Sequence, residues 1–136
     1  MRVHAIDVSG SMTDPPRGGS KNYTERAVQY VEQQNSKDFA ICFSNVLGRV
    51  ALAPKVRDVY FEGGGTIVDD VAKWMEGRFL RETDELIIYT DMMDPFILQN
   101  HYLMNLPFKL RFMIPKEFES TLTDRVKEHF EIGFYD

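Results

Sequence analysis

Hydrophobic residues along this chain follow two patterns, short apolar or alternating runs typical of strands, and helical spacing between those runs. The runs predict strands at residues 3–6, 38–43, 49–53, 85–91, 108–114 and 132–135. The run at 49–53 is predicted to be an antiparallel edge strand, because a tight connection precedes it and Pro54 ends it. The run at 3–6 is too apolar to be half exposed, so we expect it at the centre of the sheet.

Apolar residues three and four positions apart predict helices at residues 22–34, 66–78, 94–106 and 121–129. The first helix would bury Tyr23, Ala27, Tyr30 and Val31, and the second would bury Ile67, Val68, Val71, Ala72, Trp74 and Met75. Residues 55–62 show no clear pattern. Because strands and helices alternate, we predict one α/β domain over residues 1–136, with a mostly parallel sheet, one antiparallel edge strand and helices on both faces.

Composition narrows the classes of function. The formal net charge of −5 argues against a general binder of nucleic acids or anionic membranes, because both need clustered Lys and Arg. The single cysteine, Cys42, lies inside an apolar run, so we expect a buried filler and neither an intramolecular disulfide nor a catalytic thiol. No signal peptide precedes the first strand, and no apolar run approaches the ~20 residues that span a bilayer. We therefore expect a cytoplasmic protein that does not bind membranes.

Small and oxygen-bearing residues directly follow the first predicted strand, in the order Asp7-Val8-Ser9-Gly10-Ser11. Asp7, Ser9 and Ser11 alternate, so their side-chain oxygens can converge on one point beyond the strand. Gly10 would allow the sharp turn that brings both hydroxyls to the same side. Hard oxygens in this arrangement suit Mg²⁺, Mn²⁺ or Ca²⁺. Taken alone, the pentapeptide is equally typical of a polar turn after a strand.

Two further segments are expected to reach the same point. The strand at 85–91 also ends in an aspartate, Asp91, and would lie beside the first strand in a parallel sheet. The glycine run at 63–65 permits close approach of the backbone, and Thr66 then presents a hydroxyl at the start of a helix. We therefore expect Asp7, Asp91 and Thr66 to meet in one crevice.

These three motifs, in this order, resemble the metal-ion-dependent adhesion site of von Willebrand factor type A (VWA) domains. The matching segments are Asp-Val-Ser-Gly-Ser at 7–11, Gly-Gly-Gly-Thr at 63–66 and Tyr-Thr-Asp at 89–91. The resemblance covers nearly the whole chain in element order and is closest to the minimal bacterial and phage forms. It implies a doubly wound, Rossmann-like fold.

The resemblance also implies a role for each residue. Ser9 and Ser11 would bind the cation directly, and Thr66 would bind it directly or through water. Asp7 and Asp91 would hold bound waters and orient the serines. Two carboxylates roughly neutralise a dication, and one coordination position stays open for an Asp or Glu of a partner protein. The implied function is a metal-dependent adaptor with Mg²⁺ as the expected cation and Mn²⁺ or Ca²⁺ as alternatives.

The chain departs from the family pattern at two places. A Pro-Pro-Arg-Gly-Gly segment at 15–19 separates Met12 from the first long helix, whereas many relatives begin that helix directly. Relatives often have glycine after the third-motif aspartate, but this chain has two methionines there. We expect these departures to shape the partner-binding rim, for which the candidates are Asp14, Arg17, Gly65, Met92 and Met93.

A metal-dependent nuclease or phosphoryl-transfer enzyme is the alternative function, because paired aspartates with a dication also serve such reactions. Arg17 and Lys21 could then position a phosphate. Against this, no general base stands near the motifs, since His4 lies in the first strand and His101 and His129 lie on predicted helices. Each of these histidines is more often a structural or surface residue than a catalytic one.

A third possibility is a scaffold without metal. Thr66 would then only cap its helix and Asp91 only a turn. The presence of all five ligand residues together favours the metal site over this possibility.

Overall fold

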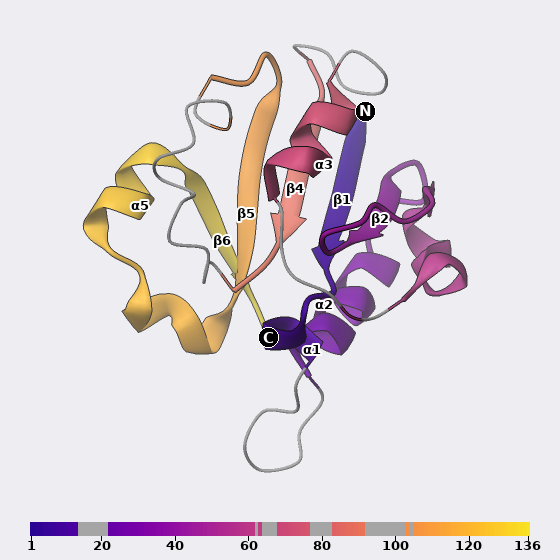
Figure 1. Ribbon diagram of the computed structural model, residues 1–136, viewed down its shortest axis with the longest axis horizontal. Helices are drawn as coiled ribbons and strands as arrows, with labels where there is room; N and C mark the ends of the chain where they lie inside the picture. Colours follow the sequence, from indigo (N-terminus) through magenta and orange to yellow (C-terminus); the bar gives the residue numbers. More distant parts are fainter. Residues whose placement is uncertain (14–21, 62, 64–67, 77–82, 92–102, 104) are drawn as a thin grey trace.

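The computed structural model describes residues 1–13, 22–61, 63, 68–76, 83–91, 103 and 105–136 (Figure 1). Its centre is a six-stranded sheet in the order β3-β2-β1-β4-β5-β6. The strands are β1 (Arg2–Asp7), β2 (Phe39–Phe43), β3 (Ala51–Leu52), β4 (Glu85–Tyr89), β5 (Lys109–Pro115) and β6 (Glu131–Tyr135). Neighbouring strands are parallel except β2 and β3, which are antiparallel. The predictions of a mostly parallel sheet with one antiparallel edge strand, and of a central first strand, are therefore confirmed.

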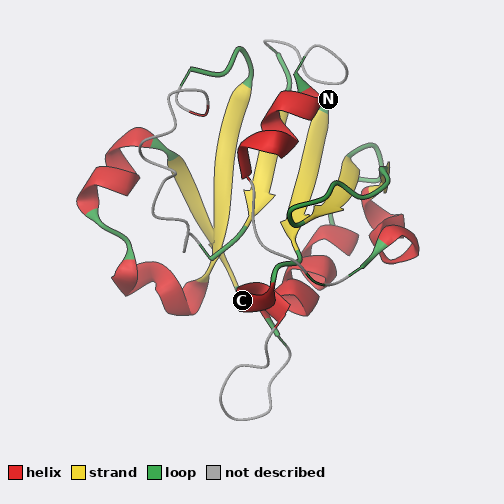
Figure 2. Ribbon diagram, viewed as in Figure 1, coloured by secondary structure: helices red, strands yellow, loops and turns green. Residues whose placement is uncertain are grey.

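Helical segments lie between several of these strands (Figure 2). They are α1 (Gly10–Thr13), α2 (Tyr23–Glu32), the 3-10 helix η1 (Ala53–Val59), α3 (Val68–Met75), the 3-10 helix η3 (Lys116–Thr121) and α5 (Asp124–His129). Helix α2 begins after Asn22, whose side-chain oxygen accepts the Glu25 N–H at 2.7 Å. Helix α5 begins after Thr123, whose hydroxyl accepts the Val126 N–H at 3.3 Å. None of the helices in the described ranges is long and apolar enough to cross a membrane.

Alternate residues of the strands contribute to two hydrophobic clusters. In β1, Val3 and Ala5 belong to one cluster, whereas Ile6 belongs to the other. The first cluster contains Val71, Ala72 and Met75 of α3, and the second contains Ala27, Val28 and Val31 of α2 together with Ala53 and Val56 of η1. Because apolar side chains leave β1 in both directions, both faces of the strand are covered, and all of its residues except Arg2 are buried.

The buried stripe of α2 differs from the predicted one. Its buried residues are Thr24, Ala27, Val28 and Val31, which follow a regular spacing of three and four positions. Tyr30, predicted to be buried, is 38% exposed. Its ring lies beside Tyr89 and Tyr135, with centroids 6.0 and 6.4 Å away, so it covers the core while its polar tip reaches solvent.

Two other segments differ from the sequence-based expectation. The unassigned residues after β3 form η1, and the helix predicted at 121–129 is preceded by η3 and begins only at Asp124. In α3, the predicted burial of Val71, Ala72 and Met75 is confirmed. Ile67, the side chains of Val68 and Trp74, and most of the helix predicted at 94–106 lie outside the described residues.

Candidate metal site

The candidate site lies where β1 and β4 end side by side (Figure 1). Ile6 and Tyr89 are the last paired residues of β1 and β4. Asp7 directly follows Ile6, and Asp91 follows Tyr89 by two residues, so both aspartates lie just beyond the paired part of the two strands. Both aspartates are nearly inaccessible, at 0% exposure for Asp7 and 5% for Asp91. Strand order reverses at β1, since β2 lies on one side of it and β4 on the other. Crevices that bind ligands in open α/β sheets form at such a reversal.

Three hydroxyl or amide donors hold Asp7 in place. Its Oδ1 accepts the backbone N–H of Ser9 at 2.8 Å, and its Oδ2 accepts the hydroxyl of Thr90 at 2.8 Å. Its backbone carbonyl accepts the hydroxyl of Thr24, in α2, at 2.9 Å. The position of Asp7 is therefore set jointly by the first loop, by the end of β4 and by α2.

The pKa of the Asp7 carboxyl is raised above its ordinary value, chiefly because burial disfavours the charged form. Hydrogen bonds from Ser9 and Thr90 oppose this rise, and the nearby negative charge of Asp91 adds to it. The two carboxylates therefore repel each other across the ends of their strands. A dication between them would favour the ionised form of both.

The Ser9 and Ser11 side chains lie together at the start of α1. Their hydroxyl oxygens are 3.4 Å apart; Ser9 is 3% exposed and Ser11 is exposed. The Ser9 carbonyl accepts N–H groups from Met12 and Thr13, each at 3.0 Å, and the Thr13 hydroxyl at 3.1 Å. These bonds close one helical turn, which is what brings the two hydroxyls to the same side.

The turn predicted at Gly10 is present, but it does not require glycine. The turn is the first turn of α1 and needs no left-handed backbone, since in the described part of the chain only Gly63 has a positive-φ glycine conformation. A Cβ added to Gly10 would meet nothing within 4 Å. Any small residue could make this turn.

The third segment approaches the end of β1 through Gly63. The Gly63 N–H donates to the Val8 carbonyl at 3.0 Å, and its φ of 112° is a conformation that L side chains rarely adopt. The start of the glycine run is therefore hydrogen-bonded to Val8, the residue that precedes Ser9. The remaining predicted site residues lie outside the described residues; they are Asp14, Arg17, Gly65, Thr66, Met92 and Met93.

The residues present fit a hard cation. Two buried carboxylates and two adjacent hydroxyls are the donors that Mg²⁺, Mn²⁺ and Ca²⁺ accept. Within the described ranges, no group of three or more His, Cys, Asp or Glu side chains could hold a metal. The expected ligand set has two carboxylates and otherwise hydroxyls, so it differs in kind from such a group.

Sequence reasoning missed two hydroxyls that position Asp7. Thr90 stood inside the third motif, but nothing in its position indicated that it would donate to Asp7. Thr24 lies 17 residues from Asp7 along the chain, and its contact follows from the packing of α2.

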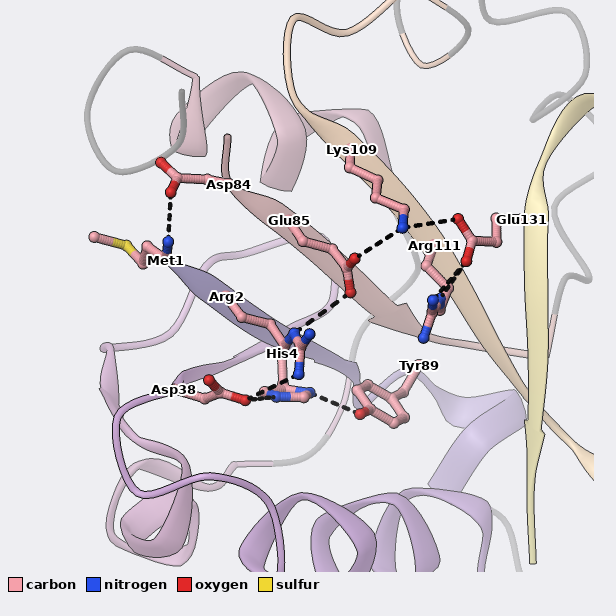
Figure 3. Close-up of polar contacts among 10 residues, drawn as sticks. All are labelled: Met1, Arg2, His4, Asp38, Asp84, Glu85, Tyr89, Lys109, Arg111 and Glu131. Atoms are coloured by element: carbon pink, nitrogen blue, oxygen red, sulfur yellow. Dashed lines mark hydrogen bonds and ion pairs between the residues drawn. The ribbon is translucent and has the colours of Figure 1, made fainter. Parts of the chain in front are cut away.

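It also missed a buried polar network that joins β1, β4 and the residue before β2 (Figure 3). His4, at 1% exposure, contacts the Tyr89 hydroxyl through Nδ1 at 2.7 Å and the Asp38 carboxylate through Nε2 at 2.8 Å. Burial lowers the pKa of His4 below its ordinary value, and Asp38 only partly opposes this. His4 therefore has a structural role here, as the sequence favoured.

Charged side chains extend this polar network at the opposite end of the sheet, where the parallel strands begin (Figure 3). Arg2 lies 3.5 Å from Glu85, and Lys109 lies 3.5 Å from both Glu85 and Glu131. These residues are mostly paired with one another. They form a region distinct from the candidate metal site.

Comparisons with protein-family models and with curated proteins found no match to this chain. Its function must therefore be inferred from its own residues.

Proposed function

We propose that this chain is a VWA-like domain that binds a protein partner through a divalent cation. The observation that carries the proposal is the meeting of Asp7 and Asp91 at the reversal of strand order, with the Ser9 and Ser11 hydroxyls beside them. The finer description of the fold as doubly wound and Rossmann-like is part of the proposal. It is supported by the strand order and by the separate clusters of α2 and α3.

Each residue would have a definite part in binding. Ser9 and Ser11 would contact the cation, Mg²⁺ or else Mn²⁺ or Ca²⁺, and Thr66 would complete the set from the glycine loop. Asp7 and Asp91 would orient the serines and neutralise the charge. When bound, the cation would supply an open coordination position for an Asp or Glu of the partner. Thr90 and Thr24 would hold Asp7 in place.

The enzymatic alternative finds less support. A general base must come within hydrogen-bond reach of the reacting group. Both ring nitrogens of His4 are engaged in the buried chain to Asp38 and Tyr89, and His129 lies at the end of α5. Arg17, Lys21 and His101 lie outside the described residues.

Isothermal titration of the full chain with Mg²⁺ and with Mn²⁺ tests the proposal. Wild type should bind one ion, and Ser9→Ala and Asp91→Asn should each weaken binding by at least about tenfold, since a charge-assisted contact contributes about 1.5–3 kcal/mol. Asp84→Asn, which removes a buried carboxylate elsewhere, is the matched control and should bind like wild type.

Two results would contradict the proposal. One is the absence of binding to wild type at millimolar metal. The other is metal-dependent hydrolysis of nucleotides or nucleic acid that disappears in Asp91→Asn, which would establish the enzyme instead.

A further inference from the structure

A groove lies between the β2–β3 connection and the end of η1. Its volume is about 360 Å³, and its lining includes Val46, Leu47, Arg49, Asp58, Tyr60 and Phe61. Phe61 packs directly on the backbone of the β2–β3 connection, because Gly48 has no side chain there. A Cβ added at Gly48 would lie 2.8 Å from a Phe61 ring carbon.

Two backbone connections place this groove beside the candidate metal site. Leu47 bridges to Phe43, which pairs with Asp7, so the groove begins two strand spacings, about 10 Å, from the end of β1. On its other wall, Phe61 precedes Gly63 by two residues, and two residues span at most about 7 Å. Gly63 in turn donates its N–H to Val8. The groove and the metal site therefore lie at the same end of the sheet, where β1 and β2 finish.

The groove combines apolar surface with one positively charged side chain, Arg49, at its rim. Val46 is 57% exposed, the largest value for a large hydrophobic residue in the described part of the chain. Leu47, Tyr60 and Phe61 are half-buried. Arg49 is exposed and forms no ion pair with another described residue.

The positive charge of Arg49 and the apolar lining of the groove together complement a partner segment that carries both an acidic and an apolar residue. Arg49 would attract the carboxylate-bearing segment that the metal site requires. Asp58, on the η1 wall, is exposed and would repel a second acidic side chain inside the groove. An uncharged apolar side chain is therefore the occupant that the groove favours.

We infer that this groove binds an apolar side chain of the same partner segment whose Asp or Glu completes the cation. The inference rests on the proposed function and specifies its partner. An extended peptide advances about 3.3 Å per residue, so the apolar residue should lie roughly two to four positions from the acidic one.

Selection of a phage-displayed random peptide library on the full chain in Mg²⁺ tests the inference. Enriched peptides should bind only with Mg²⁺ and should share an acidic and an apolar residue at a fixed spacing. Val46→Ser should weaken their binding about tenfold through lost apolar burial, without changing Mg²⁺ affinity. Arg49→Gln should weaken binding and reduce its dependence on salt.

Two matched variants serve as controls. Leu52→Ser removes an apolar side chain that lies outside the groove and is 46% exposed. Lys37→Gln removes a positive charge at the opposite end of the sheet, near the start of β1. Both should bind the peptides like wild type.

The possible failures are distinguishable. Peptides that require Mg²⁺ and an acid but no apolar residue, or equal binding by Val46→Ser, would overturn the inference and leave the proposed function standing. Complete absence of Mg²⁺-dependent peptides would overturn both. A wild-type dimer that Val46→Ser dissociates would show instead that the groove joins two copies of this chain.

Discussion

Asp7 is surrounded by donors that leave its carboxylate little freedom. Both of its carboxylate oxygens accept hydrogen bonds at 2.8 Å, one from each side of the crevice. Such bonds favour the ionised form of a buried carboxylate and so oppose part of the rise in the Asp7 pKa that burial causes. At the scale of single residues, the candidate site thus depends on neutral hydroxyls as much as on its two acids.

Thr90→Val tests this support. The substitution keeps the shape of a residue that is 2% exposed and removes the donor to Asp7. We expect a loss of about 1–3 kcal/mol in the free energy of unfolding, because a buried charged acceptor loses a partner. Urea denaturation in EDTA measures it. Thr90→Ser, which keeps the hydroxyl, should recover most of the loss, and equal stability of Thr90→Val and wild type would contradict the role of this bond.

His4 gives the protein a predictable dependence on pH. Its pKa is lowered in the folded state from the ordinary 6.5, so the unfolded chain binds more protons as the pH falls below that value. The stability that neutral His4 contributes is therefore complete above about pH 6.5 and is lost on acidification toward its lower folded pKa. Urea denaturation from pH 7.5 to 5 should show a falling free energy of unfolding.

His4→Gln should flatten this pH dependence and lower stability at neutral pH, because Asp38 and Tyr89 lose their partner. His129→Gln removes an exposed histidine and is the matched control. If wild type and His4→Gln lose stability equally on acidification, the assignment to His4 is wrong.

Single residues were predictable where local chemistry defined them. Asp7 and Ser9 follow a short apolar run, so their place at a strand end could be predicted from sequence. Thr24 and the partners of His4 could not, because these contacts join elements whose packing is not written in any local pattern.

At the scale of elements, the two turns that form the site use glycine differently. Gly63 has φ of 112°, a value that strains any other residue. Gly10 begins a helical turn with open space around it. We expect Gly63→Ala to lower the free energy of unfolding by about 1–2 kcal/mol.

Gly10→Ala is the matched control and should leave stability unchanged or raise it by up to about 1 kcal/mol, because alanine restricts the unfolded chain more than glycine. Chemical denaturation of both variants measures the contrast. Equal effects of the two substitutions would contradict the conformations assigned to these glycines.

Strands and long helices could be predicted because their periodicity is strong. The antiparallel return of β3 was signalled by its tight connection and by Pro54, and α2 by its spaced apolar residues. The 3-10 helices η1 and η3 were missed because neither offers a long periodic pattern. The misassigned Tyr30 shows that spacing alone does not separate the centre of a buried stripe from its edge.

At the scale of the whole molecule, the repulsion between Asp7 and Asp91 would link folding to the proposed metal binding. A ligand that binds only the folded state stabilises it by about 1.4 kcal/mol at ten times its dissociation constant. We expect Mg²⁺ at that excess to raise the melting temperature by roughly 3–5 °C. Asp91→Asn should remove most of the increase, and Asp84→Asn should retain it; an equal increase in all three proteins would indicate nonspecific binding.

The mostly parallel sheet with one antiparallel edge strand could be predicted because alternating strands and helices leave few arrangements. The neighbouring positions of β1 and β4, on which the site depends, followed from the same rule. The groove between the β2–β3 connection and η1 could not be predicted, since one wall of it was the segment without a clear pattern.

The central claim is that separate loops meet around one cation, and paramagnetic broadening by Mn²⁺ tests it most directly. In amide NMR spectra of the full chain, substoichiometric Mn²⁺ should broaden Ser9, Ser11, Gly63 and Asp91 together. Arg2, Glu85 and Lys109, at the other end of strands about 16 Å long, should be affected far less. Broadening centred on those three residues, or none at millimolar Mn²⁺, would contradict the account.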